Sequence, residues 1–310
     1  MNSITASTDT TPILTPHHGT LAAFAAITAL VSLSIHGFWR GIVPGDTGWL
    51  IWAQLGLLVA LLGYTSVAAQ ALRGFALVNL ALHASNWLLF TGIASSDRWA
   101  AWFGPTTPWM QQELGAQALK LVQMLVIIGT LVLLGLRRHA FYLVKGQTAA
   151  LVAPVRWLGI RRGTTWARFG PIFALVGCLV ISLSLIPVVT GAFSSGDILH
   201  VLPLLPGVVL IAASNAIYEE VVYKAAPLSQ LAPVVGRSPA LFLVAAMFGM
   251  GHFTERYFLP GTSMIFPALL GYVLAKSMLE TRGIAWAWRI HFAMDVLIFG
   301  ALALASVGQR

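Results

Sequence analysis

Residues 201–224 read VLPLLPGVVLIAASNAIYEEVVYK, and no charged side chain occurs in this stretch before Glu219. An apolar run of about 18 or more residues is typical of a helix that crosses a bilayer. This run ends on two adjacent carboxylates, Glu219 and Glu220, although only 9% of the chain is charged. The stretch therefore predicts a membrane helix over 203–231 that carries a functional site in its interior.

The composition of the whole chain also indicates a membrane protein. Of its 310 residues, 58% are hydrophobic, and the mean hydropathy is +0.82. A soluble domain of this length could not keep so much apolar surface out of water, whereas repeated apolar runs are typical of membrane helices. The predicted fold class is therefore all-α, a polytopic transmembrane helical bundle.

The charges and the single cysteine limit the possible partners. The net charge is +8, but in a membrane protein an excess of Lys and Arg usually marks cytoplasmic loops. No basic run is interleaved with aromatic side chains, so no nucleic-acid partner is expected. Cys178 is the only cysteine of the sequence, which excludes a disulfide framework and a metal site built from cysteines.

Apolar runs, with polar or Gly/Pro-rich segments between them, predict about nine membrane spans. One run contains Asn79, His83 and Asn86 and is the least certain, so eight spans are the main alternative. The expected spans are 20–38, 49–70, 74–94, 116–136, 169–189, 203–231, 238–254, 262–280 and 284–306.

A basic segment, 137–168, divides the chain. It holds seven Lys or Arg and no acidic residue, so the positive-inside rule places it in the cytoplasm. Alternation of the spans then predicts a multi-pass protein of the inner (plasma) membrane with a cytoplasmic N-terminus, and it places Lys120 outside or near the outer face. The predicted organisation is a polar tail at 1–19, a four-helix membrane region at 20–136, the basic cytoplasmic linker at 137–168, and a five-helix catalytic membrane domain at 169–310.

Three stretches break the apolar pattern, and each does so with helical spacing. A charge at bilayer depth costs several kcal/mol unless it has a partner, a water-filled cavity or a function. Residues four apart share one face of a helix. The three pairs are Glu220 and Lys224 in EEVVYK at 219–224, Phe248 and His252 in FGMGH at 248–252, and His291 and Asp295 in HFAMD at 291–295.

The three pairs are expected to lie in one layer of the membrane. With a rise of about 1.5 Å per residue, Glu220 lies roughly 16 Å, His252 roughly 21 Å and His291 roughly 12 Å from the inner end of its predicted helix. Since the hydrocarbon core is about 30 Å thick, all three positions are near mid-depth.

Two carboxylates and two imidazoles in one polar pocket favour hydrolysis. A carboxylate buried beside a second acid can take a proton from water near neutral pH. A histidine can orient that water or stabilise the developing oxyanion. Lys224, one turn after Glu220, is expected to keep that carboxylate ionised and to leave Glu219 free to act.

These motifs, in this order, resemble those of a known family. EEVVYK, FGMGH and HFAMD are similar to the EExxxR, FxxxH and HxxxN/D motifs of the CAAX protease and bacteriocin-processing (CPBP) family of intramembrane endopeptidases. The gap of about thirty residues between the acidic pair and the first histidine also resembles the family. The resemblance covers about 200–306, and the first four predicted spans carry none of it.

The resemblance implies a role for each candidate catalytic residue. Glu219 would activate the water, and His252 would help to hold it. His291 and Asp295 would bind the oxyanion, and Glu220 would support the site.

Two further residues are implied as supporting residues, Lys224 and Phe248. Lys224 stands where the family usually has arginine, and lysine cannot make a bidentate contact with a carboxylate. Asp295 stands where many members have asparagine, so it would have to be protonated to donate to an oxyanion.

A metal-free glutamate mechanism is expected, and thus no cofactor. The alternative is a divalent metal such as zinc, held by Glu219, His252 and His291, because water on zinc is a good nucleophile. The chain has no HExxH motif, and its two histidines come from different predicted helices.

The predicted function is intramembrane proteolysis of a membrane-associated protein or peptide, near a lipidated or hydrophobic anchor. Two alternatives remain open. One is a catalytically silent, CPBP-like immunity or scaffold protein whose pocket binds without cutting. The other is an ion-coupled transporter, since intramembrane acids and histidines also form proton relays.

Overall fold

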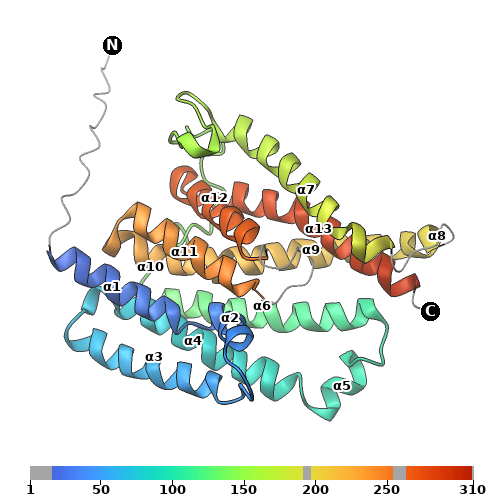
Figure 1. Ribbon diagram of the computed structural model, residues 1–310, viewed down its shortest axis with the longest axis horizontal. Coiled ribbons are helices and arrows are strands. Elements are labelled where there is room, and N and C mark those ends of the chain that lie inside the picture. Colours follow the sequence, from blue (N-terminus) through green and yellow to red (C-terminus); the bar gives the residue numbers. More distant parts are fainter. Residues whose placement is uncertain (1–15, 191–196, 254–262, 309–310) are drawn as a thin grey trace.

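A computed structural model describes residues 16–190, 197–253 and 263–308, and they form a bundle of helices (Figure 1). The all-α prediction is confirmed, since the described residues contain helices and two isolated β-bridges, with short connections between them. The first half of the bundle consists of α1 (Pro16–Leu30), η1 (Leu33–Ile35), α2 (His36–Ile42), α3 (Leu50–Val67), η2 (Gln70–Leu72), α4 (Arg73–Asn86), η3 (Trp87–Ile93), α5 (Asp97–Phe103) and α6 (Trp109–Leu133).

The second half of the bundle holds the predicted motifs. Its helices are η4 (Arg156–Leu158), α7 (Trp166–Thr190), α8 (Asp197–Val201), η5 (Leu202–Leu204), α9 (Leu205–Glu220), η6 (Val221–Ala225), α10 (Ala226–Val235), α11 (Arg237–Gly251), α12 (Ile265–Thr281) and α13 (Ala285–Gly308). Helix α13 packs along both α7 and α9, and α11 packs along α12 (Figure 1).

The predicted count of nine spans is not confirmed. By length and composition, the described residues contain six helices that can cross a membrane, or seven if the bent pair α1 and α2 forms one span. The predicted spans 238–254 and 262–280 correspond to α11 and α12, which have 15 and 17 residues. Both are shorter than the roughly 20 residues that a bilayer requires of a helix.

The least certain predicted span, 74–94, belongs to one of the six candidate membrane helices, Gln70–Ile93. Its polar side chains are tolerated because they are buried in protein and bonded to backbone. Asn79 donates to the carbonyl of Phe75 at 2.9 Å, and His83 Nε2 donates to the carbonyl of Val31 at 3.3 Å.

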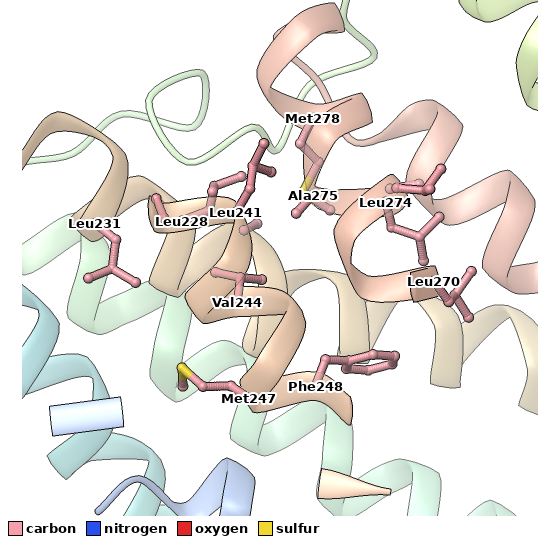
Figure 2. Packing of buried hydrophobic residues seen from close by; sticks show 14 of the residues in the cluster. Leu228, Leu231, Leu241, Val244, Met247, Phe248, Leu270, Leu274, Ala275 and Met278 are labelled. Carbon is pink, nitrogen blue, oxygen red and sulfur yellow. The ribbon is translucent and has the colours of Figure 1, made fainter. Parts of the chain in front are cut away.

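The main hydrophobic core lies between α10, α11 and α12. Figure 2 shows Leu228 and Leu231 of α10 on one side of α11, and Leu270 and Leu274 of α12 on the other. Phe248 of α11 points toward α12 in the same view. This packing positions the end of α11 that carries the second predicted motif.

The basic segment between α6 and α7 folds against the C-terminal helices. The backbone N–H of Gln147 donates to the carbonyl of Thr281 at 2.7 Å, and that of Ile284 donates to Val144 at 2.9 Å. Trp286 Nε1 donates to the carbonyl of Thr148 at 2.8 Å. The segment is thus part of the folded C-terminal half, and the predicted division of the chain at this segment stays a prediction.

Replacing Glu280 by alanine should loosen this segment. The carboxylate accepts from Lys276, from the backbone N–H of Ala153 at 3.2 Å and from Trp166 Nε1 at 2.9 Å. Leaving such buried donors unpaired costs about 1–3 kcal/mol, so limited trypsin digestion at the arginines of 137–165 should become about tenfold faster. Asp46→Ala, which removes an exposed carboxylate, is the control, and equal digestion rates in both variants would refute the prediction.

Candidate functional site

The three predicted motifs meet where α9, α11 and α13 come together. Glu219 and Glu220 are the last two residues of α9, and Lys224 follows in a π-helical segment, η6. His252 directly follows α11, and His291 belongs to the first half of α13.

Glu220 is fully buried and contacts both Lys224 and His291. Its side chain and that of Lys224 have no exposed surface, and Lys224 Nζ lies 2.9 Å from Glu220 Oε1. The same oxygen lies 2.6 Å from His291 Nδ1. An ionised carboxylate can only accept, so His291 donates from Nδ1 to Glu220. The predicted pairing of Lys224 with Glu220 is confirmed, and it leaves Glu219 outside this ion pair.

The other ring nitrogen of His291 faces two carboxylates. Nε2 lies 3.5 Å from Glu219 Oε2 and 3.6 Å from Asp295 Oδ1. Glu219 Oε2 is buried and, among the described residues, has no hydrogen-bond partner. Glu219 therefore presents one carboxylate oxygen beside an imidazole nitrogen, an arrangement suited to proton transfer with a small molecule such as water.

Two residues that the sequence analysis did not select complete the group. Asn215 is buried, and its Nδ2 donates to Glu219 Oε1 at 3.1 Å and to Asp295 Oδ2 at 3.0 Å. Lys120 Nζ donates to Asn215 Oδ1 at 2.7 Å. Because Lys120 can only donate and the two carboxylates can only accept, the amide of Asn215 has a single compatible orientation.

Lys120 is thus not at the outer face, where the sequence analysis placed it. The span was predicted to begin at residue 116, but α6 begins at Trp109. Lys120 therefore lies about 16 Å along this helix, near its middle. The helix start was missed because the polar residues Gln111 and Gln112 resemble loop residues in the sequence. In the structure their side chains donate to the backbone carbonyls of Trp102 and Thr107, which precede the helix.

His252 and Phe248 form the third side of the site. His252 Nδ1 donates to the carbonyl of Phe248 at 2.7 Å. The Phe248 ring lies 4.4 Å from the His252 ring and 6.1 Å from the His291 ring, and Lys224 Nζ lies 3.4 Å from its centroid. Phe248 therefore has a packing and cation–π role at this site.

All these groups except Glu220 and Lys224 line one cavity of about 260 Å³. Its polar wall consists of Glu113, Lys120, Ser184, Asn215, Glu219, His252, His291 and Asp295. Its other walls are apolar and come from α7, α11, α12 and α13, with Ile181, Leu185, Phe248, Phe266, Pro267, Leu270, Met294, Ile298, Phe299 and Leu302. The cavity can hold a short piece of extended peptide with apolar side chains.

The π-helical segment Val221–Ala225 was not predicted. Such segments are frequent at functional sites, because one extra residue in a turn re-aims the side chains around it. Here the π-helical segment directly follows the acidic pair and contains Lys224, whose Nζ contacts Glu220 Oε1. Nothing in the sequence EEVVYKA signals this local widening of the helix.

The residues considered for a metal do not form a recognisable ligand set. Within the described residues, no group of three or more His, Cys, Asp or Glu has a geometry that could hold a metal ion. Glu219, His252 and His291 share the cavity, but His291 Nδ1 is bound to Glu220 and His252 Nδ1 to a carbonyl. The expectation of a metal-free mechanism stays a prediction.

Comparison with known proteins identifies part of the chain. Residues 200–297 match the family model of type II CAAX prenyl endopeptidase Rce1-like proteins. This match confirms the predicted CPBP resemblance and contains every predicted site residue, whereas Lys120 lies outside it. No curated protein and no solved structure matches the chain.

Proposed function

We propose, from the premise that residues 200–297 form an Rce1-like domain, that this membrane protein is an intramembrane endopeptidase of the glutamate type. Its substrate is a membrane-associated protein or peptide, cut near a lipidated or hydrophobic anchor. The observation that carries the proposal is the carboxylate of Glu219, which lines the cavity with His252 and has one oxygen without a hydrogen-bond partner among the described residues.

In the proposed reaction a water molecule is held between Glu219 and His252. Glu219 takes a proton from this water as its oxygen adds to the carbonyl carbon of the substrate. The proton then passes to the amide nitrogen as the C–N bond breaks. The products are a new carboxylate and a new amine, so the atoms balance without a cofactor.

His291 is assigned to the oxyanion that forms in the first step. Its Nδ1 is fixed by Glu220, which aims Nε2 into the cavity. With a proton on Nε2, the ring donates to the developing negative charge, and one such donor is worth about 10²–10³-fold in kcat. Asp295 accepts from Asn215 in the structure, so we assign it to holding Asn215 and His291 rather than to donating.

The reaction can be tested with purified protein in liposomes that carry membrane-anchored peptides. Cleavage in water enriched in ¹⁸O should place one heavy oxygen in the new C-terminus, as measured by mass spectrometry. A folded wild-type protein that cuts none of the peptides in a broad, anchor-varied library, and that leaves their termini intact, would refute the proposal. A binding or immunity protein would give that result.

Lys120 and Asn215 are proposed to position Glu219 through their hydrogen bonds. Lys120→Met should lower kcat by about 10–100-fold, because small displacements of reacting groups have effects of this size. Asn215→Leu should have a similar effect, and the double variant should be little worse than either one, since the two residues act in series.

Lys120→Arg is the matched control, because arginine can still donate to Asn215 Oδ1. It should recover most of the activity lost in Lys120→Met. Strictly additive losses in the double variant, or no recovery with arginine, would show that Lys120 acts only through general packing.

A further inference from the structure

A second cavity, of about 200 Å³, lies on another side of the same site. It is lined by Leu33, Ser34, Gly37, Glu219, Tyr223, Met247, Phe248, Gly251 and His252. Leu33, Ser34 and Gly37 come from η1 and α2, outside the region that matches the family.

The two cavities share only part of the site. Glu219, Phe248 and His252 line both of them, whereas His291 and Asp295 line the first cavity alone. The shared polar residues are the two that are assigned to the water. The residues near the oxyanion face the larger cavity, where the substrate is proposed to bind. Glu219 and His252 can therefore be reached from the second cavity without contact with His291 or Asp295.

The wall that the N-terminal helices contribute is a bend between two helical stretches that together are long and apolar enough to cross a membrane. The axes of the helical stretches Gly19–Leu30 and Leu33–Ile42 differ by 59°. The carbonyl groups freed at the break are bonded by side chains: Leu30 accepts from Trp39 Nε1 at 2.8 Å, and Ser32 accepts from Gln54 Nε2 at 3.1 Å.

A non-helical backbone at membrane depth is tolerated where it is buried in protein or lines a water-filled cavity. At this break Ser32 is buried, and Leu33 and Ser34 line the second cavity. Gly251 allows the close approach, because a Cβ at this position would lie 2.7 Å from the carbonyl oxygen of Ser34.

The second cavity also has polar groups suited to water. Four of its nine lining residues are polar, and Tyr223 OH is held at 3.0 Å by Tyr218 OH. Ser34 lies roughly 12 Å along the chain axis from Ile42, the last residue of α2. The exposed, charged side chain of Asp46 follows this helix end. The cavity is therefore near a turn that carries a charge, and an exposed charge requires contact with water.

We propose that the second cavity supplies the hydrolytic water to Glu219 and His252 while the peptide fills the first cavity. The inference rests on the proposed function. Its physical basis is that a bound apolar peptide displaces water from the larger cavity, whereas hydrolysis consumes one water molecule for each bond that is cut. A separate polar cavity at Glu219 and His252 provides that reactant from a side that His291 and Asp295 do not line.

The hydration of the second cavity can be measured without any enzymatic activity. In a Cys178→Ala background, Ser34→Cys should react with a charged, membrane-impermeant methanethiosulfonate at least about tenfold faster than Leu125→Cys, because only a hydrated thiol forms the reactive thiolate. Leu125 is exposed on the outer face of α6 and contacts lipid in a membrane. Equal, slow labelling of both variants, with Ser34→Cys labelled normally after denaturation, would overturn the inference.

Filling the cavity tests its role in catalysis. Ser34→Leu and Gly37→Leu should each lower kcat by about tenfold or more with KM nearly unchanged, since the supply of water is not part of substrate binding. Ile42→Trp, on an exposed position of α2, should leave both constants unchanged. The kcat and KM values are measured with a peptide that the wild-type protein cuts.

The outcomes separate this inference from the proposed function. A raised KM or a shifted cleavage position in the filled variants would show that the second cavity binds peptide, and it would overturn the water role. A wild-type protein that cuts nothing would instead refute the proposed function, and the labelling of Ser34→Cys would still report whether the cavity holds water.

Discussion

Replacing Lys224 by methionine is expected to lower the free energy of unfolding, measured in detergent micelles, by about 3–5 kcal/mol. The reason is the complete burial of both members of the ion pair, with Lys224 Nζ 2.9 Å from Glu220 Oε1 and no exposed surface on either side chain. Methionine has a similar volume but no charge, so the carboxylate of Glu220 would be left in the interior with its contact to His291 Nδ1 but without a lysine cation. The loss of the cation over the Phe248 ring adds to the effect.

Two comparisons make this prediction specific. The double variant with Glu220→Gln should recover most of the lost stability, because it removes the uncompensated charge. Lys145→Met, at an exposed position of the segment before α7, should change stability by less than about 0.5 kcal/mol. A loss below about 1 kcal/mol for Lys224→Met would mean that water reaches this pair and that the contact is worth no more than a surface salt bridge.

Glu219→Gln is expected to lower kcat by roughly 10³–10⁴-fold, the upper part of the range for removal of a general base. Glutamine keeps the shape of the side chain and can still accept from Asn215 Nδ2 through Oε1. It cannot take a proton from water at Oε2. Because the change removes an interaction of the transition state, KM should stay within about twofold of the wild-type value.

The control for this variant is Asp46→Asn, which also turns one carboxylate into an amide. Asp46 is exposed and accepts from Gly48 N–H, within its own loop, at 2.9 Å. It should retain full activity. Retention of activity in Glu219→Gln as well, in a protein that inserts and unfolds normally, would remove Glu219 from the mechanism.

Much of the site could be predicted because membrane burial makes charged residues informative. In an apolar helix, a charge without a partner is so costly that Glu220, Lys224, His291 and Asp295 had to find partners inside the bundle. The i, i+4 spacing then indicated which side chains share a face of one helix. The depths of the motifs along their predicted helices indicated that the three motifs lie in one layer of the membrane. The structure places these residues in contact or on one cavity.

The contributions of residues outside the three motifs could not be predicted in this way. Lys120 was placed near the outer end of its predicted span, because the polar residues before 116 were read as a loop, although Gln111 and Gln112 belong to α6 and donate to residues that precede it. Asn215 carries no charge and has no motif of its own, so only the three-dimensional contacts reveal its role. The break between α1 and α2 was read as part of one continuous span, since its backbone is satisfied by distant side chains such as Gln54.

For a related reason, the nine predicted spans outnumber the six or seven candidate spans among the described residues. Hydropathy does not distinguish a helix that faces lipid from a short apolar helix enclosed by others. Helices α11 and α12 are apolar because they pack against each other and against α10 (Figure 2), and neither is long enough by itself to be counted as a span.

We propose that this chain cuts peptide bonds in the membrane with Glu219 as the base. The most direct test compares the termini of all membrane proteins, by mass spectrometry, between cells with the wild-type protein and cells with Glu219→Gln. The account predicts a set of termini that is present with the wild type and absent with the variant, located beside hydrophobic or lipidated segments. Identical termini in the two strains, with the variant present in the membrane at the wild-type level, would contradict it.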